Sequence, residues 1–162
     1  MSLSFRAAAE ADGAAIWAML EPVLRAGEVF ALPRDWDRAA ALGYWCAPHH
    51  TVCVAEDGGE VVGCYYLRPN QLGGGDHVAN AGYMTAPGAA GRGVGRAMCE
   101  DSFARAASLG FQAMQFNFVV ASNLGAVRLW RACGFDEVGR LPQAFRHPTL
   151  GPVDALVMYR RI

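Results

Sequence analysis

The chain reads Pro87-Gly88-Ala89-Ala90-Gly91-Arg92-Gly93-Val94-Gly95-Arg96 between two segments of different character. The segment before it, residues 78–85, is apolar and contains Tyr and Thr, which is typical of a strand. The segment after it, residues 94–109, is rich in Ala, Met and Arg, which favours a helix. Glycines let the backbone turn tightly, and the start of a helix presents free N–H groups. The stretch therefore predicts a site for phosphate oxygens, with Arg92 and Arg96 adding charge at its rim.

The glycine spacing excludes two familiar phosphate-binding loops. A dinucleotide fingerprint that starts at Gly91 needs glycine at the place of Arg96, and one that starts at Gly93 needs glycine at the place of Met98. A Walker-type loop needs a lysine, and the chain has none, because all 14 of its basic residues are arginine. The remaining alternative to a phosphate site is a tight turn between strand and helix that binds nothing.

A second stretch, from Asn123 to Phe135, has the features of a short helix. Asn123 is a favourable N-cap residue, and Gly134 is favourable just beyond the C-terminus. Ala126 and Trp130 recur at helical spacing and predict a buried face.

Together the two stretches resemble the motifs of the GCN5-related N-acetyltransferases (GNAT). The family's pyrophosphate loop is Gln/Arg-x-x-Gly-x-Gly/Ala, in which Gly93 and Gly95 fill the glycine places and Ala90 replaces Gln or Arg. The family's later motif, Asn-x-x-Ala-x-x-Leu-Tyr-x-x-x-Gly-Phe, matches residues 123–135 except that Trp130 replaces the tyrosine. In the family that tyrosine is credited with protonating the departing CoA thiolate, and an indole N–H is not a usable acid. The resemblance thus implies the fold, with one part of the usual chemistry missing or moved.

The resemblance also implies which residues bind acetyl-CoA, the single cofactor expected. Loop amides would hold the pyrophosphate, and backbone groups of the preceding strand would pair with the pantetheine arm. The cofactor-binding residues predicted in this way are Tyr83, Met84, Thr85, Ala90, Gly91, Arg92, Gly93, Val94, Gly95, Arg96, Asn123 and Trp130. No metal site is expected.

Hydrophobic periodicity and turn residues predict eleven elements in the order β-α-α-β-β-β-α-β-α-β-β, and Asp12 is expected to cap the first helix. This order is that of the GNAT fold, which the chain resembles over nearly its whole length. The resemblance implies an α/β fold with a mixed twisted sheet, helices on both faces and two splayed parallel central strands. We expect a single acetyltransferase domain over residues 1–162, with a connection from Pro142 to Pro152. Strands are expected at 4–8, 51–56, 61–68, 77–85, 112–121, 136–141 and 153–161, and helices at 12–25, 37–45, 94–109 and 123–133.

Two asparagines stand in the middle of apolar strand-like segments, where Asn is a poor strand former and its amide needs partners. They are Asn80 and Asn117. One interpretation is a core amide bonded to neighbouring backbone, or one that faces water at a sheet edge. The other is catalytic: in the resembled fold these two strands diverge where the thioester enters, so an amide on each would flank the acceptor amine. We predict that Asn80 positions the amine or its water, and that Asn117 holds a polar group of the acceptor.

The strand motifs also resemble yeast-type N-acetyltransferases that act on azetidine-2-carboxylate and proline analogues. In those enzymes a His-x-x-Asn-Ala-Gly strand and a Phe-Asn-x-Val strand recur, with a Val-Asp-Ala ending. Residues 77–82, 116–119 and 153–155 match these patterns. The substrate does not follow from the pattern alone.

Four further residues are candidates for the acceptor pocket. Glu28, Phe30 and Trp36 lie in the connection between the first two helices, which lines that pocket in the resembled fold. Arg146 lies in the last connection, near the expected pocket mouth. A carboxylate could hold an amine, an arginine could hold a carboxylate, and the aromatic rings could form an apolar wall. Each charged residue could equally be a solvated surface group.

Composition narrows the class of protein. The chain has 162 residues, of which 53% are hydrophobic and 18% charged, and this suits a folded α/β protein. The net charge of −1 argues against a nucleic-acid partner. No apolar run approaches about 18 residues, so no membrane span is expected. The N-terminus lacks the pattern of a signal peptide, and the five cysteines form no paired motif, so we expect a cytoplasmic protein with buried thiols.

We therefore predict an acetyl-CoA-dependent N-acetyltransferase. The acceptor is expected to be a small-molecule amine, such as an amino acid or imino-acid analogue, which attacks the thioester directly. One alternative is acetylation of a protein N-terminus or lysine. Another is a regulatory module that binds CoA with reduced catalysis, which Ala90 and Trp130 suggest. The sequence is also compatible with a homodimer.

Overall fold

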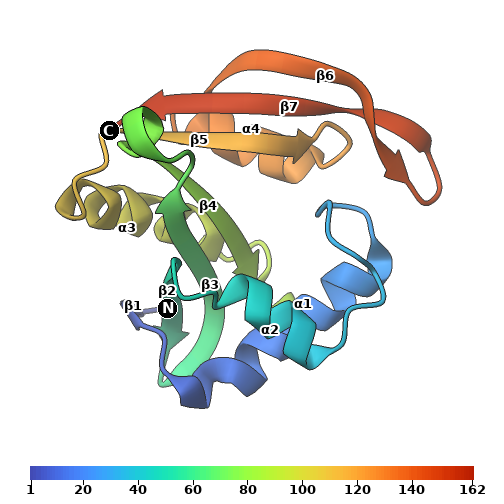
Figure 1. The fold of residues 1–162 in the computed structure, drawn as a ribbon. Coiled ribbons are helices and arrows are strands. Elements are labelled where there is room, and N and C mark those ends of the chain that lie inside the picture. Colours follow the sequence, from blue (N-terminus) through green and yellow to red (C-terminus); the bar gives the residue numbers. More distant parts are fainter.

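Seven strands form one mixed sheet in the order β1-β2-β3-β4-β5-β7-β6 (Figure 1). The structure, a computed structural model, describes residues 1–162. Only the contact between β4 and β5 is parallel, and all other neighbours are antiparallel. The strands are β1 (Leu3–Ala7), β2 (Thr51–Asp57), β3 (Glu60–Pro69), β4 (Val78–Thr85), β5 (Ala113–Val120), β6 (Asp136–His147) and β7 (Gly151–Arg161). The helices are α1 (Gly13–Ala26), α2 (Arg38–Trp45), α3 (Val94–Ser108) and α4 (Leu124–Ala132), with short 3-10 turns at Glu10–Asp12, Gly73–Gly75 and Pro87–Ala89.

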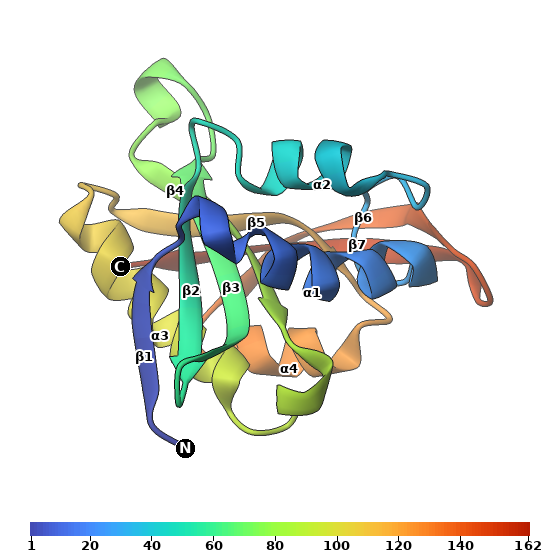
Figure 2. The ribbon, with the colours of Figure 1, turned by 90° about the horizontal axis from the view of Figure 1, so that it is seen from below.

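The helices cover both faces of the sheet, as predicted, because alternate strand residues are apolar on each side. On β3, Cys64 and Tyr66 pack in a cluster with α1 and α2, whereas Tyr65 and Leu67 pack in a second cluster with α3 and α4. Figure 2 shows α1 and α2 on the same side of strands β2 and β3. The sheet is therefore the middle layer of three, with a separate apolar core on each face.

The two parallel strands separate almost immediately. β4 and β5 are paired only at Val78 with Ala113 and at Ala79 with Met114. Beyond these two pairs, the edge of β4 that faces β5 has no ladder partner. β5 is also irregular on its other side, because its register with β7 shifts between Phe116 and Val119. The predicted splay of the central strands is thus present, and it begins at Asn80.

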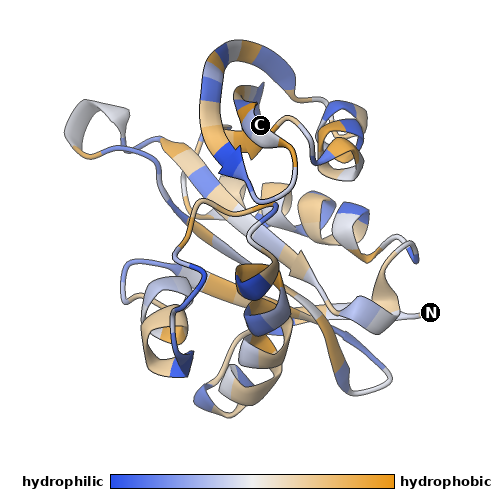
Figure 3. Cartoon of the chain, turned by 90° about the vertical axis from the view of Figure 1, so that its right-hand side faces the viewer, coloured by the Kyte–Doolittle hydropathy of each residue, from blue (hydrophilic) through white to orange (hydrophobic).

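The C-terminal hairpin differs from the prediction. The expected connection from Pro142 to Pro152 is mostly strand, because β6 continues to His147 and pairs with β7 up to Gly151. Pro142 is tolerated because β6 is an edge strand whose register shifts between Leu141 and Phe145. Figure 1 shows the hairpin as a long arm, and Figure 3 shows hydrophilic and hydrophobic residues alternating along it.

Asp12 also has a different role from the predicted one. It stands at the N-cap of α1, but its side chain caps no amide of that helix. Instead its carboxylate accepts hydrogen bonds from Arg6 at 2.8 and 2.9 Å and from the backbone N–H of Ala9 at 2.7 Å. These bonds hold the pKa of Asp12 below its usual value, with the Arg6 hydrogen bond as the main cause. The residue therefore ties β1 to the turn before α1.

Candidate active site

A cavity of about 370 Å³ opens at the point where β4 and β5 separate. Most of its lining residues are apolar or aromatic, and the connection after α1 closes one side of it. Its walls combine both diverging strands, the α1–α2 connection and the start of α4. The lining residues are Val23, Val29, Phe30, Ala31, Leu32, Tyr44, Trp45, Tyr66, Arg68, Asn80, Ala81, Gly82, Tyr83, Met84, Thr85, Phe116, Asn117, Phe118, Val119, Val120, Asn123, Ala126 and Trp130.

Asn80 is buried at the start of the split and lines the cavity. Its Nδ2 donates to the carbonyl oxygen of Gln115 on β5 at 3.0 Å, so a side-chain amide replaces the next bond of the interrupted ladder. Its Oδ1 accepts from Nε of Arg68 on β3 at 3.2 Å. The residue therefore joins three strands at the apex of the opening.

Asn117 lies on the opposite wall, within the irregular part of β5. Its Nδ2 donates to Oδ1 of Asn70 at 2.6 Å, and its Oδ1 accepts from Nε2 of Gln115 at 2.9 Å. The two predicted catalytic asparagines are thus brought to one cavity, on the two strands that diverge. Both also satisfy the alternative interpretation in part, since their amides have partners within the protein.

The glycine-rich loop ends in α3, as predicted, with left-handed backbone at Gly91 (φ 75°) and Gly93 (φ 83°). A Cβ at either position would meet no other atom within 4 Å, so backbone conformation rather than crowding requires these glycines. Amides at the start of α3 have no intrahelical acceptor. None of the backbone N–H groups of Gly91, Gly93, Val94, Gly95 and Arg96 donates to an acceptor in the protein.

The two arginines of this loop have partners. Arg92 pairs with Asp57 of the β2–β3 hairpin at 3.0 Å, and Arg96 pairs with Glu100 one turn further along α3 at 3.0 Å. Ala90 is exposed and has extended backbone. The free donors of the loop are therefore its backbone amides, while both guanidinium groups remain at its rim.

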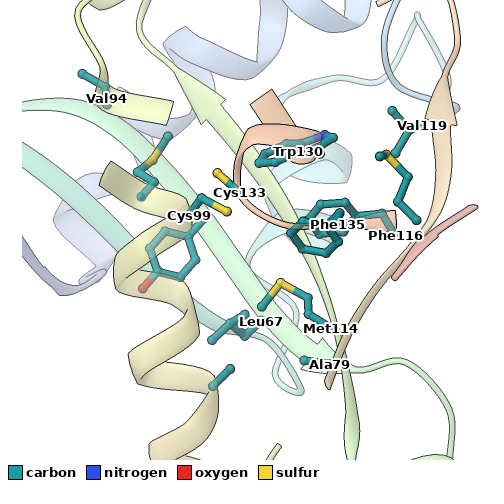
Figure 4. Packing of buried hydrophobic residues seen from close by; sticks show 14 of the residues in the cluster. Leu67, Ala79, Val94, Cys99, Met114, Phe116, Val119, Trp130, Cys133 and Phe135 are labelled. Carbon is teal, nitrogen blue, oxygen red and sulfur yellow. The ribbon is translucent and has the colours of Figure 1, made fainter. Parts of the chain in front are cut away.

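Trp130 of α4 faces the cavity and packs among aromatic rings. Its ring centroid lies 4.9 Å from those of Tyr83 and Phe116, and Figure 4 shows it beside Phe116 and Phe135. Asn123 caps α4, as predicted, by accepting from the N–H of Ala126 at 3.4 Å. The hydroxyl of Tyr83 points into the core, 2.8 Å from Ser102 Oγ, and burial raises its pKa well above the usual value. Tyr83 therefore lines the cavity but does not replace the missing phenol as an acid.

Of the four further residues predicted for the acceptor pocket besides Asn117, only Phe30 lines the cavity. Glu28 is exposed, and Trp36 packs on Tyr44 with ring centroids 5.6 Å apart, behind the wall. Arg146 is exposed on β6, paired with Pro152, because the segment expected to be a connection is a strand. The structure thus brings Asn80, Asn117 and Phe30 together and leaves Glu28, Trp36 and Arg146 outside.

The model of the Acetyltransferase (GNAT) family matches residues 16–135, about three quarters of the chain. The chain belongs to the GNAT family of acetyltransferases. A solved GCN5-related N-acetyltransferase from Kribbella flavida is 41% identical and superposes with a TM-score of 0.94, over 99% of this chain and 98% of that one. Both the predicted family and the predicted fold are confirmed.

Two further relatives share less sequence identity with this GNAT chain. A phosphinothricin acetyltransferase from Sinorhizobium meliloti, solved with acetyl-CoA, is 21% identical with a TM-score of 0.86, over 100% of this chain and 89% of that one. The N-acetyltransferase aca1 of Schizosaccharomyces pombe is 31% identical over 86 residues. That match covers 53% of this chain and 41% of the yeast protein, so it spans less than half of the curated relative.

Sequence reasoning missed three polar residues of this GNAT site: Arg68, Asn70 and Gln115. They form the hydrogen bonds around the two asparagines. Arg68 stands opposite Asn80 in the register of β3 and β4. A prediction of that register from the sequence would have placed Arg68 beside Asn80. Gln115 lies two residues before Asn117 on β5, so the period-2 pattern of a strand places both side chains on one face. Asn70 meets Asn117 across the fold, and no signal in the sequence predicts that contact.

No helix has both the length and the apolar character needed to cross a membrane. No three side chains of His, Cys, Asp or Glu are grouped so that they could hold a metal ion.

Proposed function

We propose that this GNAT chain transfers the acetyl group of acetyl-CoA to the amine of a small molecule, such as an amino acid or imino-acid analogue. The observation that carries the proposal is the cavity at the split between β4 and β5, with the loop of free amides beyond the far end of β4. Five unpaired N–H groups at a helix start suit the oxygens of a pyrophosphate. The unpaired edge of β4 suits an extended arm that carries amides of its own.

In this proposal the pantetheine arm lies along β4 beside Tyr83, Met84 and Thr85, and the thioester reaches the cavity. The neutral amine attacks the carbonyl carbon, the new C–N bond forms, and the C–S bond breaks. The CoA sulfur leaves with the electron pair of that bond, and the proton lost by the amine balances its charge. A free N–H of β4 would stabilise the oxyanion, because a fixed donor in an apolar cavity costs no reorganisation.

The proton must leave without a carboxylate, because the cavity is lined by no Asp, Glu or His. We propose that a water held by Asn80 takes the proton from the amine. Asn117 would contact a polar group of the acceptor from the opposite wall. Trp130 supplies no acid, so the thiolate would be protonated by solvent.

A small acceptor is favoured because Phe30, Leu32 and Trp45 line the cavity on the side of the α1–α2 connection and limit its volume to about 370 Å³. A protein substrate would have to insert a terminus or lysine into this aromatic enclosure. The same features fit a module that binds CoA and has lost catalysis, since Trp130 stands where the family's tyrosine is expected.

The test is incubation of the purified chain with acetyl-CoA, a thiol reagent and a panel of acceptors. The panel contains free amino acids, imino acids, simple amines, and peptides with a free N-terminus or an internal lysine. We expect thiol release with some of the small amines, and mass spectrometry should find one added acetyl group on them. Release with the peptides alone would contradict the small-molecule proposal. Binding of acetyl-CoA without release by any acceptor would identify a regulatory module.

A further inference from the structure

The cavity carries a single formal charge, and it is positive. Of the 23 lining residues, only Arg68 has a charged side chain. A cavity meant for a simple cationic amine would be expected to offer a carboxylate, because an opposite charge offsets the cost of removing the amine from water. This cavity instead offers a guanidinium among aromatic and aliphatic walls.

Arg68 lacks the partner that most other arginines of the chain have. Seven arginines pair with a carboxylate within 4.0 Å, and Arg68 is not among them. Its Nε donates to the neutral Oδ1 of Asn80, and its other neighbour is the Tyr66 hydroxyl, so no carboxylate balances its charge. Arg68 is half-buried, whereas the unpaired Arg38, Arg128 and Arg161 are exposed and solvated. A half-buried guanidinium with no carboxylate partner is a site for a planar anion.

The surroundings hold this guanidinium in place. Asn80, which anchors Nε, is itself fixed by its bond to the backbone of Gln115. Tyr66 lies on the same face of β3, with its ring stacked on His50 at a centroid distance of 4.2 Å and its hydroxyl 3.5 Å from that of Tyr44. Burial raises the pKa of Tyr66 above its usual value, so this phenol is neutral and does not compete as an anion for Arg68.

We propose that Arg68 binds a carboxylate of the acceptor and thereby restricts this enzyme to amines that carry an acidic group, with free amino acids as the simplest class. The inference rests on the proposed function and names its substrate class. Arg68 lies next to the apex of the split, across β4 from the opening. An α-amino acid whose carboxylate meets Nη1 and Nη2 therefore directs its amine toward the diverging strands. Arg68 is a specificity-determining residue, and takes no proton in the reaction.

The experiment compares acceptors that differ only in the acidic group: L-leucine and L-phenylalanine against their carboxamides. A carboxamide lowers the pKa of the neighbouring amine and supplies more neutral nucleophile, so a preference for the acid would arise against this trend. We expect the native enzyme to prefer the acids in kcat/KM. Arg68→Gln should reduce kcat/KM for the acids by roughly ten- to a hundredfold, the usual effect of lost hydrogen bonds to a charged group. The carboxamides and the KM for acetyl-CoA should be unchanged.

Two matched variants complete the design. Arg68→Lys keeps the charge but loses the paired donors, so it should recover only part of the preference. Arg38→Gln removes an exposed, unpaired arginine of α2 and should leave both acceptor classes unaffected. If Arg68→Gln lowers acids and carboxamides equally, or if the native enzyme prefers the carboxamides, the assignment of Arg68 is wrong.

A binding measurement separates this inference from the proposed function. Calorimetry with 3-phenylpropanoate and 3-phenylpropanamide, which carry no amine, needs no turnover. Tighter binding of the acid to the native chain, lost in Arg68→Gln, supports the anion site even if no amine is acetylated. Equal affinity for the acid and the amide in the native chain would overturn the inference even if the enzyme proves active on other amines.

Discussion

At the residue scale, the two cavity asparagines serve the fold and are available to a ligand at the same time. Asn80 bridges β4 and β5, and Asn117 is held by Asn70 and Gln115, so removal of either side chain costs hydrogen bonds within the protein. Each amide oxygen still has a second lone pair that could accept from an amine or a water. Loss of stability alone therefore cannot distinguish the two roles. A control variant is needed that breaks the same hydrogen bond at a residue outside the cavity.

The pair Asn117 and Asn70 offers that match. Asn117→Ala and Asn70→Ala break the same 2.6 Å hydrogen bond, but only Asn117 lines the cavity. We expect Asn117→Ala to raise the KM for the acceptor by roughly ten- to a hundredfold, with little change for acetyl-CoA, because it removes a bond to a polar group of the acceptor. Asn70→Ala should leave the KM near normal. Steady-state kinetics beside melting temperatures decide the matter, and equal KM values in the two variants would refute direct contact.

Trp130 stands where the resembled motif has an acidic phenol, and its environment is aromatic packing. Trp130→Phe should keep most of the turnover, because the indole moves no proton. Trp130→Tyr restores the phenol, and its side chain has almost the same volume as that of the Phe variant. The kcat of the Tyr variant should therefore equal or exceed that of the Phe variant. The two variants lose similar packing and serve as controls for each other. A fall of several hundredfold in the Phe variant, with acetyl-CoA binding intact, would show that the indole takes part in the chemistry.

The hydrogen bonds of the Asp12 carboxylate make the stability of the folded chain depend on pH. Its pKa in the folded chain is depressed by Arg6 and by the Ala9 amide, so its contribution is complete above the unfolded pKa of about 3.9. As the pH falls through the lower folded pKa, protonation removes that contribution. Asp12→Asn should therefore lower the melting temperature by several degrees at pH 7, and the difference should shrink below about pH 4. Asp136→Asn, an exposed residue without an ion pair, is the control and should show no such convergence.

At the element scale, the loop before α3 is the feature that the sequence predicts best. Its glycines are required by left-handed backbone, a constraint that can be read from residue types alone. Gly93→Ala should weaken acetyl-CoA binding at least tenfold, because a Cβ there stands where the phosphates approach the amides. Gly110→Ala is the matched control: Gly110 has φ 90°, an equally open position, and lies at the far end of α3.

Both alanine variants place a side chain in left-handed backbone, so they should lose similar stability. Calorimetric titration with acetyl-CoA then separates strain from binding. We expect the Gly110 variant to bind as the native chain does. A folded Gly93 variant with native affinity would show that the pyrophosphate lies elsewhere.

The sequence predicts the features that depend on contacts between neighbouring residues. It does not predict those that depend on contacts between residues far apart in the sequence. The helices, the strands and the caps at Asn123 and Gly134 follow from local patterns, and the structure confirms them. The extension of β6 past Pro142 was not predicted, because proline usually ends a strand. It is tolerated here because β6 is an edge strand and its register shifts next to Pro142. Arg68 and Asn70 did not follow either, because their contacts with Asn80 and Asn117 join segments that are distant in the sequence.

At the scale of the whole molecule, the sheet consists of two parts joined by a short contact. β1 to β4 form one part and β5 to β7 the other, and only two residue pairs of β4 and β5 connect them through the ladder. The side chain of Asn80 adds a third link, and the core beneath α3 and α4 adds packing. A ligand that lies along β4 and reaches the amides at the start of α3 would therefore stabilise the weakest part of the sheet.

Acetyl-CoA should consequently raise the melting temperature of the native chain. At a ligand concentration 100 times the Kd, binding to the folded state alone adds about 2.7 kcal/mol, which corresponds to roughly 5–10 °C for a chain of this size. Hydrogen exchange should slow in β4 and in residues 87–96, while the edge strands β1 and β6 should be unaffected. The Gly93→Ala variant should show neither effect. Uniform protection of all strands would indicate general stabilisation, and protection confined to the β6–β7 hairpin would place the ligand outside the split.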